Sequence, residues 1–527
     1  MENSTKNQRK GFLGAVERIG NALPHPAILF FLFSIIVIIA SELVARTGVS
    51  VTYYDARAKE EVTKTAVSLM NAEGLRYIFN NATKNFTGFA PLGTVLVAML
   101  GVGVAESTGL ISAALKNLIT SVPKSLLTAV VVFAGIMSNI ASDAGYVVVI
   151  PLGAIVFSGA GRHPIAGLAA AFAGVSAGFS ANLAIGTLDP LLGGITNEAL
   201  KSVGMVGEVL PTDNYYFMAA STFLLTIVGT LVTDKFIEPR LGTYTGSYKP
   251  DHEPLTTVER KGLRFAGLSL LVFMVIMAYL MVKLPGNLPG NGVFLEPDAS
   301  GKLVLNNFLG NGLLLAILLM FLIPGAIYGK VTGVIKNSND LIGGMTDAMK
   351  SMGAYMVLSF FAAQFINYFS YTNLGLLVSF QGAELLRSIG FVGLPLIIAF
   401  VILAAFLNLF MGSASAKWAV MAPIFVPMMA QLDIAPEFTQ LAYRIGDSTT
   451  NIITPLMSYF AMIVVFVKRY DEDSGLGTLI STMLPYSFFF LMSWIILLVI
   501  WYVLGLPIGP GGAGIHTSMN LIQSFFV

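Results

Sequence analysis

Five charged side chains lie well inside long apolar stretches of this sequence, away from the ends of those stretches. They are Asp143, Asp189, Lys417, Arg444 and Asp447. If the stretches cross a lipid bilayer, a charge at its centre costs at least ~2.5–3.5 kcal/mol, so each residue needs a partner or a water-filled cavity. We therefore expect this small set of residues to carry the chemistry of the protein.

Arg444 and Asp447 are one helical turn apart, close enough for an ion pair on one helix face. One interpretation is that they neutralise each other. The other is that the guanidinium group receives a substrate carboxylate while Asp447 takes part in ion coupling. The Ser, Thr, Thr and Asn at 448–451 favour the second interpretation, because their oxygens suit hard cations. A sodium site is predicted near Asn408, Asp447 and Asn451, completed by backbone carbonyls at broken-helix ends.

Three further residues have two interpretations each. Asp189 precedes a proline near the outer end of its segment, where it is either an interfacial helix cap or a coupling residue. Trp418 is either a packing residue or an aromatic surface on which a ring can stack. Lys417 is expected to snorkel toward a surface or cavity rather than act at the site. His25 and His163 each precede a proline at the start of a segment, and we expect both to begin helices.

Two apolar runs are too long for one membrane crossing. As helices, residues 125–158 would extend about 50 Å and residues 391–430 about 60 Å, against a hydrocarbon core of ~30 Å. Each run is interrupted by small polar residues, which predicts a hairpin that enters and leaves on the same side. The predicted tips are Ser138, Asn139, Ser142 and Asp143 in the first run, and Gly412 and Ser413 in the second.

Loop charges indicate which way each hairpin opens, because basic loops stay in the cytoplasm. With the N-terminus cytoplasmic, every basic loop falls inside only if 125–158 opens to the inside and 391–430 opens to the outside. The acidic turn with Asp433 and Glu437 then lies outside. The basic residues on which this depends are Lys6, Arg9, Lys10, Arg18, Lys116, Lys124, Arg162, Arg240, Lys249, Arg260, Lys261, Arg264, Lys330, Lys336, Lys468 and Arg469.

The segments that follow the two hairpins share residues. Residues 182–191 (NLAIGTLDPL) align without gaps on residues 447–456 (DSTTNIITPL). Paired polar and proline positions in two oppositely inserted halves are typical of secondary carriers, whose sites lie where broken helices meet near mid-membrane. The sequence therefore predicts an all-α polytopic membrane protein. We expect about nine transmembrane helices plus two re-entrant helical hairpins in an inverted-repeat arrangement.

The chain is expected to divide into five successive parts. Residues 1–124 and 237–390 would supply scaffold helices, the latter with a central cytoplasmic loop. Residues 125–236 and 391–467 would form the two halves of a core, and residues 468–527 a C-terminal helix. The segment 47–86 has no role that the sequence explains.

Composition excludes most other classes of protein. Of the 527 residues, 55% are hydrophobic and 11% charged, whereas a soluble domain carries roughly 25% charged residues. The net charge of +1 gives no basic field for nucleic acid, and the absence of cysteine excludes disulfides and thiol catalysis. The sequence has no HExxH and no phosphate-binding loop, so neither an enzyme nor an ATP-driven pump is expected. The first apolar segment is interpreted as an anchor rather than a cleaved signal peptide.

Several longer motifs resemble the aminobenzoyl-glutamate transporter (AbgT) family, and the resemblance extends nearly from end to end. The motifs are VERIGNALPHP at 16–26, NFTGFAPLG at 85–93, GRHPIAGL at 161–168, FSANL at 179–183, TDKFIEPRLG at 233–242, GSASAKWAVMAPIFVPM at 412–428, YRIGDSTTNIITPLMSYF at 443–460 and WYVLGLPIGPG at 501–511.

The resemblance implies a homodimer in the bacterial inner membrane, with nine transmembrane helices and two hairpins per subunit. It implies a dimerising scaffold and a transporting core. The family includes importers of p-aminobenzoyl-glutamate and exporters of sulfonamide antimetabolites, driven by proton or sodium gradients. Carried over by motif, the transport residues are Asp189, Asn408, Ser415, Trp418, Pro436, Arg444 and Asp447.

We therefore expect a dimeric carrier for p-aminobenzoyl-glutamate or related aminobenzoate and sulfonamide compounds, with sodium or protons as the coupling ion and no other cofactor. The ligand's ring is expected near Trp418, and its anionic end near Arg444 and the hairpin helix N-termini. The closest alternative is a sodium–dicarboxylate symporter of similar architecture. An ion channel is a more remote alternative, since broken hairpins also line pores.

Overall fold

The computed structural model describes residues 24, 26–55, 60–120, 123–141, 145–205, 207–246, 255–285, 289–297, 301, 303–305, 307–454, 457, 459–472 and 474–510. Within these residues the fold is mostly helical. Six helices are long and apolar enough to cross a membrane, and two bent helix pairs raise that number to eight. The prediction of a polytopic helical membrane protein is confirmed, while the number of nine crossings stays a prediction.

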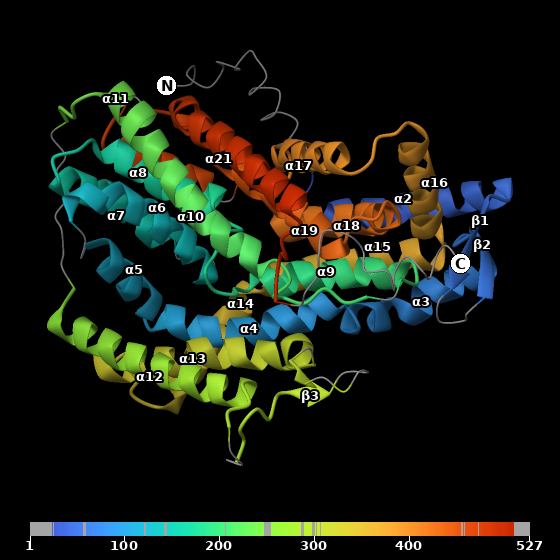
Figure 1. The fold of residues 1–527 in the computed structure, drawn as a ribbon, viewed down its shortest axis with the longest axis horizontal. Coiled ribbons are helices and arrows are strands. Elements are labelled where there is room, and N and C mark those ends of the chain that lie inside the picture. Colours follow the sequence, from blue (N-terminus) through green and yellow to red (C-terminus); the bar gives the residue numbers. More distant parts are fainter. Residues whose placement is uncertain are drawn as a thin grey trace, which may run out of the picture.

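Helices at one side of the molecule form a layer of their own (Figure 1). In it, α13 packs on α4 and α12, and α14 packs on α4. The bounds on this side are α4 (Ala90–Ser107), α5 (Leu110–Thr120), α12 (Thr257–Met281), η6 (Phe308–Gly312), α13 (Leu313–Thr332) and α14 (Ser338–Ser351). Helix α9 (Leu188–Ser202) packs against α4 and also against α18 and α19 of the opposite side, so it joins the two.

The opposite side contains the two predicted hairpins and the helices around them (Figure 1). Its N-terminal elements are η1 (Lys124–Leu126), α6 (Leu127–Ser138), η2 (Asn139–Ala141), η3 (Gly145–Val149), α7 (Ile150–Gly159), α8 (Pro164–Phe172), η4 (Ala173–Ala177), α10 (Tyr215–Val232), η5 (Thr233–Ile237) and α11 (Glu238–Leu241). Its C-terminal elements are α16 (Leu374–Ser388), α17 (Leu394–Asn408), α18 (Ala414–Gln431), α19 (Pro436–Thr449), η7 (Asn451–Ile453), α20 (Phe460–Lys468) and α21 (Leu476–Leu504).

Residues 125–158 do not form one continuous helix. Helix α6 has 12 residues and α7 has 10, so at 1.5 Å per residue each is about half the ~30 Å core. The arms meet at the tip, where a Cβ on Gly145 would lie 2.0 Å from Ser138 Oγ. The predicted tip residues Ser138 and Asn139 lie at the end of the first arm, whereas Ser142 and Asp143 lie outside the described residues.

Residues 391–430 are likewise split, into α17 and α18 around a non-helical segment at 409–413. The rings of Phe400 on α17 and Phe425 on α18 lie 5.0 Å apart, so the two arms contact each other. At the tip, Ser413 is the N-cap of α18, and its hydroxyl accepts a hydrogen bond from the Ala416 N–H. A cap of this kind satisfies one of the backbone donors that a helix start leaves free. Gly412 directly precedes it.

The helix after each hairpin is broken. The first ends at Gly178 and resumes at Leu188; the second ends at Thr449 and resumes at Phe460 after the short η7. The ungapped alignment does not superimpose the two breaks, because Asn182 already lies in the first break while Asp447 is still helical.

The mismatch has a local reason. Gly178 closes the first helix, and the aligned position in the second half is Tyr443, which continues α19. Helix α19 is also held tightly against α17, since a Cβ on Gly446 would lie 2.3 Å from Val401 O. That close approach of two backbones requires glycine at this position.

The segment 47–86, whose role the sequence did not explain, contacts α15 (Gly353–Tyr371) through the helix at its C-terminal end. Strands β1 (Ser50–Asp55) and β2 (Glu60–Thr65) pair antiparallel and lead into α3 (Ala72–Thr87). Asn85 donates to Gln364 Oε1 at 3.0 Å, and the rings of Tyr77 and Tyr371 stack 3.9 Å apart. The remaining elements are α2 (Pro26–Thr47), which also packs on α15, and the paired strands β3 (Glu296–Pro297) and β4 (Leu303–Val304).

The base of the first hairpin is fastened by Arg162, between α7 and α8. Its guanidinium group bridges Asp234 (2.6 Å) and Glu238 and donates to Thr128 Oγ1 at 2.6 Å. These contacts tie both arms of the hairpin to η5 and α11. The next residue, His163, begins α8, as predicted, with its Nδ1 accepting from the Ile165 N–H at 3.3 Å. His25 lies outside the described residues.

Candidate functional site

The polar residues predicted around the second hairpin meet in one buried cluster. Lys417 Nζ lies 2.7 Å from Asp447 Oδ1, and both side chains are only 2% exposed. Lys417 also donates to Asn408 Oδ1. The Tyr443 hydroxyl is shared between Ala414 O (2.5 Å) and Asp447 Oδ1 (3.2 Å). Lys417 was expected to snorkel toward a surface or cavity rather than act at the site, but it is buried and belongs to this cluster.

The position of Lys417 is costly without a partner. The residue lies in the first turn of α18, where the helix dipole favours anions over cations. Burial removes its hydration as well, a penalty that only good ion-pair and hydrogen-bond geometry offsets. Its partner Asp447 comes from the last turn of α19, which packs on α18. The second hairpin and the second broken helix are thus joined through one ion pair.

Asn408, the last residue of α17, organises the region behind this pair. Its amide nitrogen lies within hydrogen-bond distance of Asp447 O (2.7 Å), Asn451 Oδ1 (2.8 Å) and Thr450 Oγ1 (3.0 Å). Thr450 in turn donates to Ala405 O at 3.0 Å. These contacts hold the end of α19 against the end of α17. The residues predicted to form a sodium site do lie together, but the Lys417 ammonium fills the space between the Asn408 carbonyl and the Asp447 carboxylate.

Arg444 does not pair with Asp447, so the interpretation that they neutralise each other is wrong. Arg444 Nη1 lies 2.8 Å from Asp189 Oδ1, and Nη2 donates to Ser180 O at 3.0 Å. Asp189 Oδ2 also accepts from the Gly186 N–H at 2.8 Å. Asp189 therefore folds back onto its own break and bridges it to α19. It is more than an interfacial cap, and Arg444 fastens the first break to the second broken helix.

Trp418 is completely buried and packs inside the core. Its ring stacks on Tyr443 with centroids 4.4 Å apart, and its Nε1 donates to Thr196 Oγ1 at 3.0 Å. Thr196 Oγ1 lies 2.6 Å from Gln440 Oε1. In this conformation Trp418 is a packing residue and does not present its ring to a cavity. Pro436 is the buried first residue of α19, about one helical turn before Gln440.

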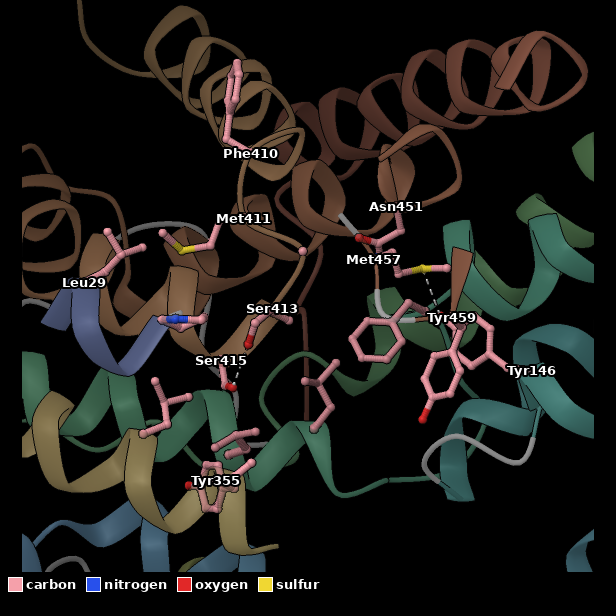
Figure 2. A pocket seen from close by; sticks show the side chains of 18 of the residues that line it. Leu29, Tyr146, Tyr355, Phe410, Met411, Ser413, Ser415, Asn451, Met457 and Tyr459 are labelled. Carbon is pink, nitrogen blue, oxygen red and sulfur yellow. Dashed lines mark hydrogen bonds between the residues drawn. The ribbon is translucent and has the colours of Figure 1, made fainter. Parts of the chain in front are cut away.

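A cavity of about 680 Å³ opens in front of the second hairpin tip (Figure 2). Ligand pockets typically enclose about 300–1,000 Å³, so this one suits a small molecule. Its lining is mostly aliphatic and aromatic, with a few hydroxyl and amide groups, and comes from the hairpin tips, both helix breaks, α2, α9 and α15. The lining residues include Leu29, Tyr146, Phe179, Tyr355, Phe410, Met411, Gly412, Ser413, Ser415, Asn451, Met457 and Tyr459.

Four predicted site residues line this cavity: Gly412, Ser413, Ser415 and Asn451. Figure 2 shows the hydroxyls of Ser413 and Ser415 facing each other, 3.5 Å apart, with Asn451 across the cavity. Asn451 Oδ1 accepts from the Asn408 amide, and Asn408 Oδ1 accepts from Lys417, so contacts connect the cavity lining to the Lys417–Asp447 pair. Trp418, Arg444 and Asp189 are absent from the lining of this cavity, and the expectation that a ligand lies near Trp418 and Arg444 stays a prediction.

The cavity's tyrosines were not predicted from the sequence. The rings of Tyr146 and Tyr459 stack 4.5 Å apart, joining the first hairpin to the second break (Figure 2). Ser176 donates to the Met457 sulfur at 3.1 Å alongside them. Both tyrosines follow a helix break within an apolar run, which is the signal that would have indicated them. Tyr355 reaches the cavity from α15, and its hydroxyl donates to Pro91 O at 2.9 Å.

Asp213, in the turn before α10, is a buried carboxyl group outside the membrane-spanning helices. Burial, with a smaller contribution from Glu208, raises its pKa to about 6, although the Leu210 N–H bonded to its Oδ2 acts the other way. The unfolded chain keeps the ordinary pKa of 3.8. The folded protein therefore holds this proton over a range in which the unfolded chain has lost it, so stability falls as the pH rises from about 4 to about 6.

We predict that Asp213→Asn will be more stable than the parent at pH 8 by roughly 2–3 kcal/mol, because the buried charge is gone. The advantage should shrink toward pH 4, where the parent carboxyl is neutral. Thermal unfolding at pH 4, 6 and 8 measures this, with the exposed Asp347→Asn as a control. A pH-independent difference between Asp213→Asn and the parent would show that the carboxyl does not titrate in this range.

Comparisons with known proteins agree with this architecture. Residues 11–516 match the model of the AbgT putative transporter family. The chain is 39% identical to the p-aminobenzoyl-glutamate transport protein of Escherichia coli K12, over 96% of this chain and 97% of that protein. It is similar to the crystal structure of the YdaH transporter of Alcanivorax borkumensis (TM-score 0.84, 43% identity, 92% and 100% of the two chains). It is also similar to MtrF of Neisseria gonorrhoeae, described with a class of antimetabolite efflux pumps (TM-score 0.87, 47% identity, 95% and 100%).

Proposed function

Since this chain belongs to the AbgT transporter family, we propose that it is an ion-coupled secondary carrier for p-aminobenzoyl-glutamate and related aminobenzoate or sulfonamide compounds in the bacterial inner membrane. The observation that carries the proposal is the cavity of about 680 Å³ between the second hairpin tip and the second helix break. Secondary carriers bind their substrates where discontinuous helices meet.

The lining of the cavity fits a ligand with an aromatic ring and polar ends. Tyr146, Tyr355 and Tyr459 supply faces and edges for a ring. Ser413, Ser415 and Asn451 supply donors and acceptors for an amide or a sulfonyl group. The same tip starts α18, whose first backbone N–H groups and partial positive charge favour a carboxylate. In this proposal the ligand's anionic end faces α18 rather than Arg444.

A variant that fills the cavity tests its role. Ser415→Trp places a large ring at the tip, beside Ser413, and should reduce transport of labelled p-aminobenzoyl-glutamate in proteoliposomes to background. Its melting temperature should change little, because the ring enters existing space. Ser415→Ala removes one hydroxyl from the same position and should retain most of the transport rate.

Normal transport by Ser415→Trp would place the substrate elsewhere. Inhibition of labelled transport by succinate, but not by sulfonamides, would instead favour a dicarboxylate carrier. The proposal also includes a homodimer, which the family resemblance implies, and a cytoplasmic N-terminus, which the distribution of basic loops supports. Cross-linking in membranes tests the dimer, and labelling of single introduced cysteines tests the orientation, since the chain has no cysteine of its own.

A further inference from the structure

The predicted sodium site already contains a cation that belongs to the chain. The ammonium group of Lys417 lies 2.7 Å from Asp447 Oδ1 and donates to Asn408 Oδ1. It also lies 5.6 Å from the centre of the Tyr443 ring, close enough for a cation–π contact. A carboxylate, an amide carbonyl and an aromatic face therefore surround it, as they would a bound metal cation.

The other side-chain oxygens of the predicted site are also engaged. Asn451 Oδ1 accepts from the Asn408 amide, and its own nitrogen donates to Ser176 O at 3.2 Å. Thr450 Oγ1 lies 3.0 Å from the Asn408 amide nitrogen and donates to Ala405 O. Asp447 Oδ2 is the exception, because it is buried and accepts no hydrogen bond. Since hard cations need several free oxygens, sodium does not fit these residues while Lys417 is in place.

The position of Lys417 suggests that this arrangement is selected rather than incidental. The first turn of a helix disfavours a cation, and the side chain is only 2% exposed. A neutral residue would avoid both costs if the cluster merely needed packing. The lysine is explained if Asp447 requires a permanent counter-charge.

We propose that the Lys417 ammonium is the resident cation of the Asp447 site, that it excludes sodium, and that transport by this protein therefore needs no sodium. Lys417 thus determines ion specificity. Removing its charge would leave a buried carboxylate beside the Asn408 carbonyl, a site that sodium can enter. The statement about transport rests on the proposed function, whereas the statement about sodium binding does not.

The first arm of the experiment measures binding without any substrate. The full-length protein, purified in detergent, is melted in sodium chloride and in choline chloride at equal concentration. The parent should have the same melting temperature in both salts. Lys417→Ala should melt lower in choline and be raised by sodium, because an ion that binds the folded state stabilises it. Lys417→Arg keeps the charge and should not respond to sodium.

Two further variants test whether a response to sodium comes from this site. Lys417→Gln keeps a hydrogen-bond donor and should show the same response to sodium if Lys417→Ala does not fold. Adding Asp447→Asn to either variant should abolish that response. A sodium-specific rise in the parent's melting temperature, or no response in both neutral Lys417 variants, would overturn the proposal.

The second arm measures flux in proteoliposomes with sodium or choline on both sides and a proton gradient across the membrane. Parent flux should be equal in the two salts, and an absolute requirement for sodium would overturn the proposal. Absence of flux in either salt would count against the proposed function instead, and the melting experiment would still decide the role of Lys417.

Discussion

Asp447→Ala will lower the free energy of unfolding by about 3–5 kcal/mol, because it leaves the Lys417 ammonium buried without its counter-charge. Both side chains of this pair are 2% exposed, so water cannot replace the missing partner. The variant should also lose coupled transport, since the end of α19 is held to the second hairpin through this contact. Chemical unfolding of the purified protein measures the first effect, and flux in proteoliposomes the second.

A double variant separates the ion pair from simple loss of packing. Lys417→Ala with Asp447→Ala removes both charges and should recover part of the stability that Asp447→Ala loses, because no unpaired charge remains. The exposed pair of Lys350 and Asp347 provides the control. Asp347→Ala should change stability by less than about 1 kcal/mol, as is usual for surface pairs. If Asp447→Ala cost no more than Asp347→Ala, the buried pair would have no structural role.

The ion pair between Arg444 and Asp189 can be broken from either side, and the two variants will not be equally destabilising. Asp189→Ala leaves the Arg444 guanidinium buried and should cost about 3–5 kcal/mol. Arg444→Ala should cost less, because the remaining Asp189 carboxylate is 13% exposed and still accepts the Gly186 N–H. Both should abolish transport, since the first break is no longer fastened to α19. Chemical unfolding of both variants measures which loses more stability, and flux in proteoliposomes measures the loss of transport.

Arg444→Lys is the matched control, because it keeps the charge. The guanidinium group contacts Asp189 and Ser180 O with two different nitrogens, whereas an ammonium group acts as a single point charge. Arg444→Lys should therefore be more stable than Arg444→Ala, but it should not regain the full transport rate. Equal stability losses for Asp189→Ala and Arg444→Ala would show that burial of an unpaired guanidinium group is not the main cause of the loss.

The hairpins could be predicted because length and loop charge are properties of the sequence itself. The runs at 125–158 and 391–430 exceed one bilayer crossing, and each is indeed split into two arms. The pairing of charges could not be predicted in the same way. Spacing along a helix shows that Arg444 and Asp447 are neighbours, but the partners Asp189 and Lys417 come from other elements, brought close only by tertiary packing.

The depth at which Lys417 is buried could not be predicted from the sequence either. A lysine near a polar break resembles one that reaches solvent, yet Lys417 points into the core because Asp447 and Asn408 are placed there by α19 and α17. The residues of the cavity were only partly found for a similar reason. Ser413, Ser415 and Asn451 stand out as polar residues in apolar runs, whereas Tyr146 and Tyr459 are marked only by the helix breaks that they follow, and their stacking arises from tertiary packing.

The most direct test of the transporter assignment is flux of labelled p-aminobenzoyl-glutamate in proteoliposomes, with a proton or a sodium gradient imposed in turn. We expect saturable movement driven by the proton gradient, without a requirement for sodium and abolished by Ser415→Trp. No movement under either gradient would contradict p-aminobenzoyl-glutamate as the substrate. Large unitary currents in place of saturable flux would contradict a carrier altogether.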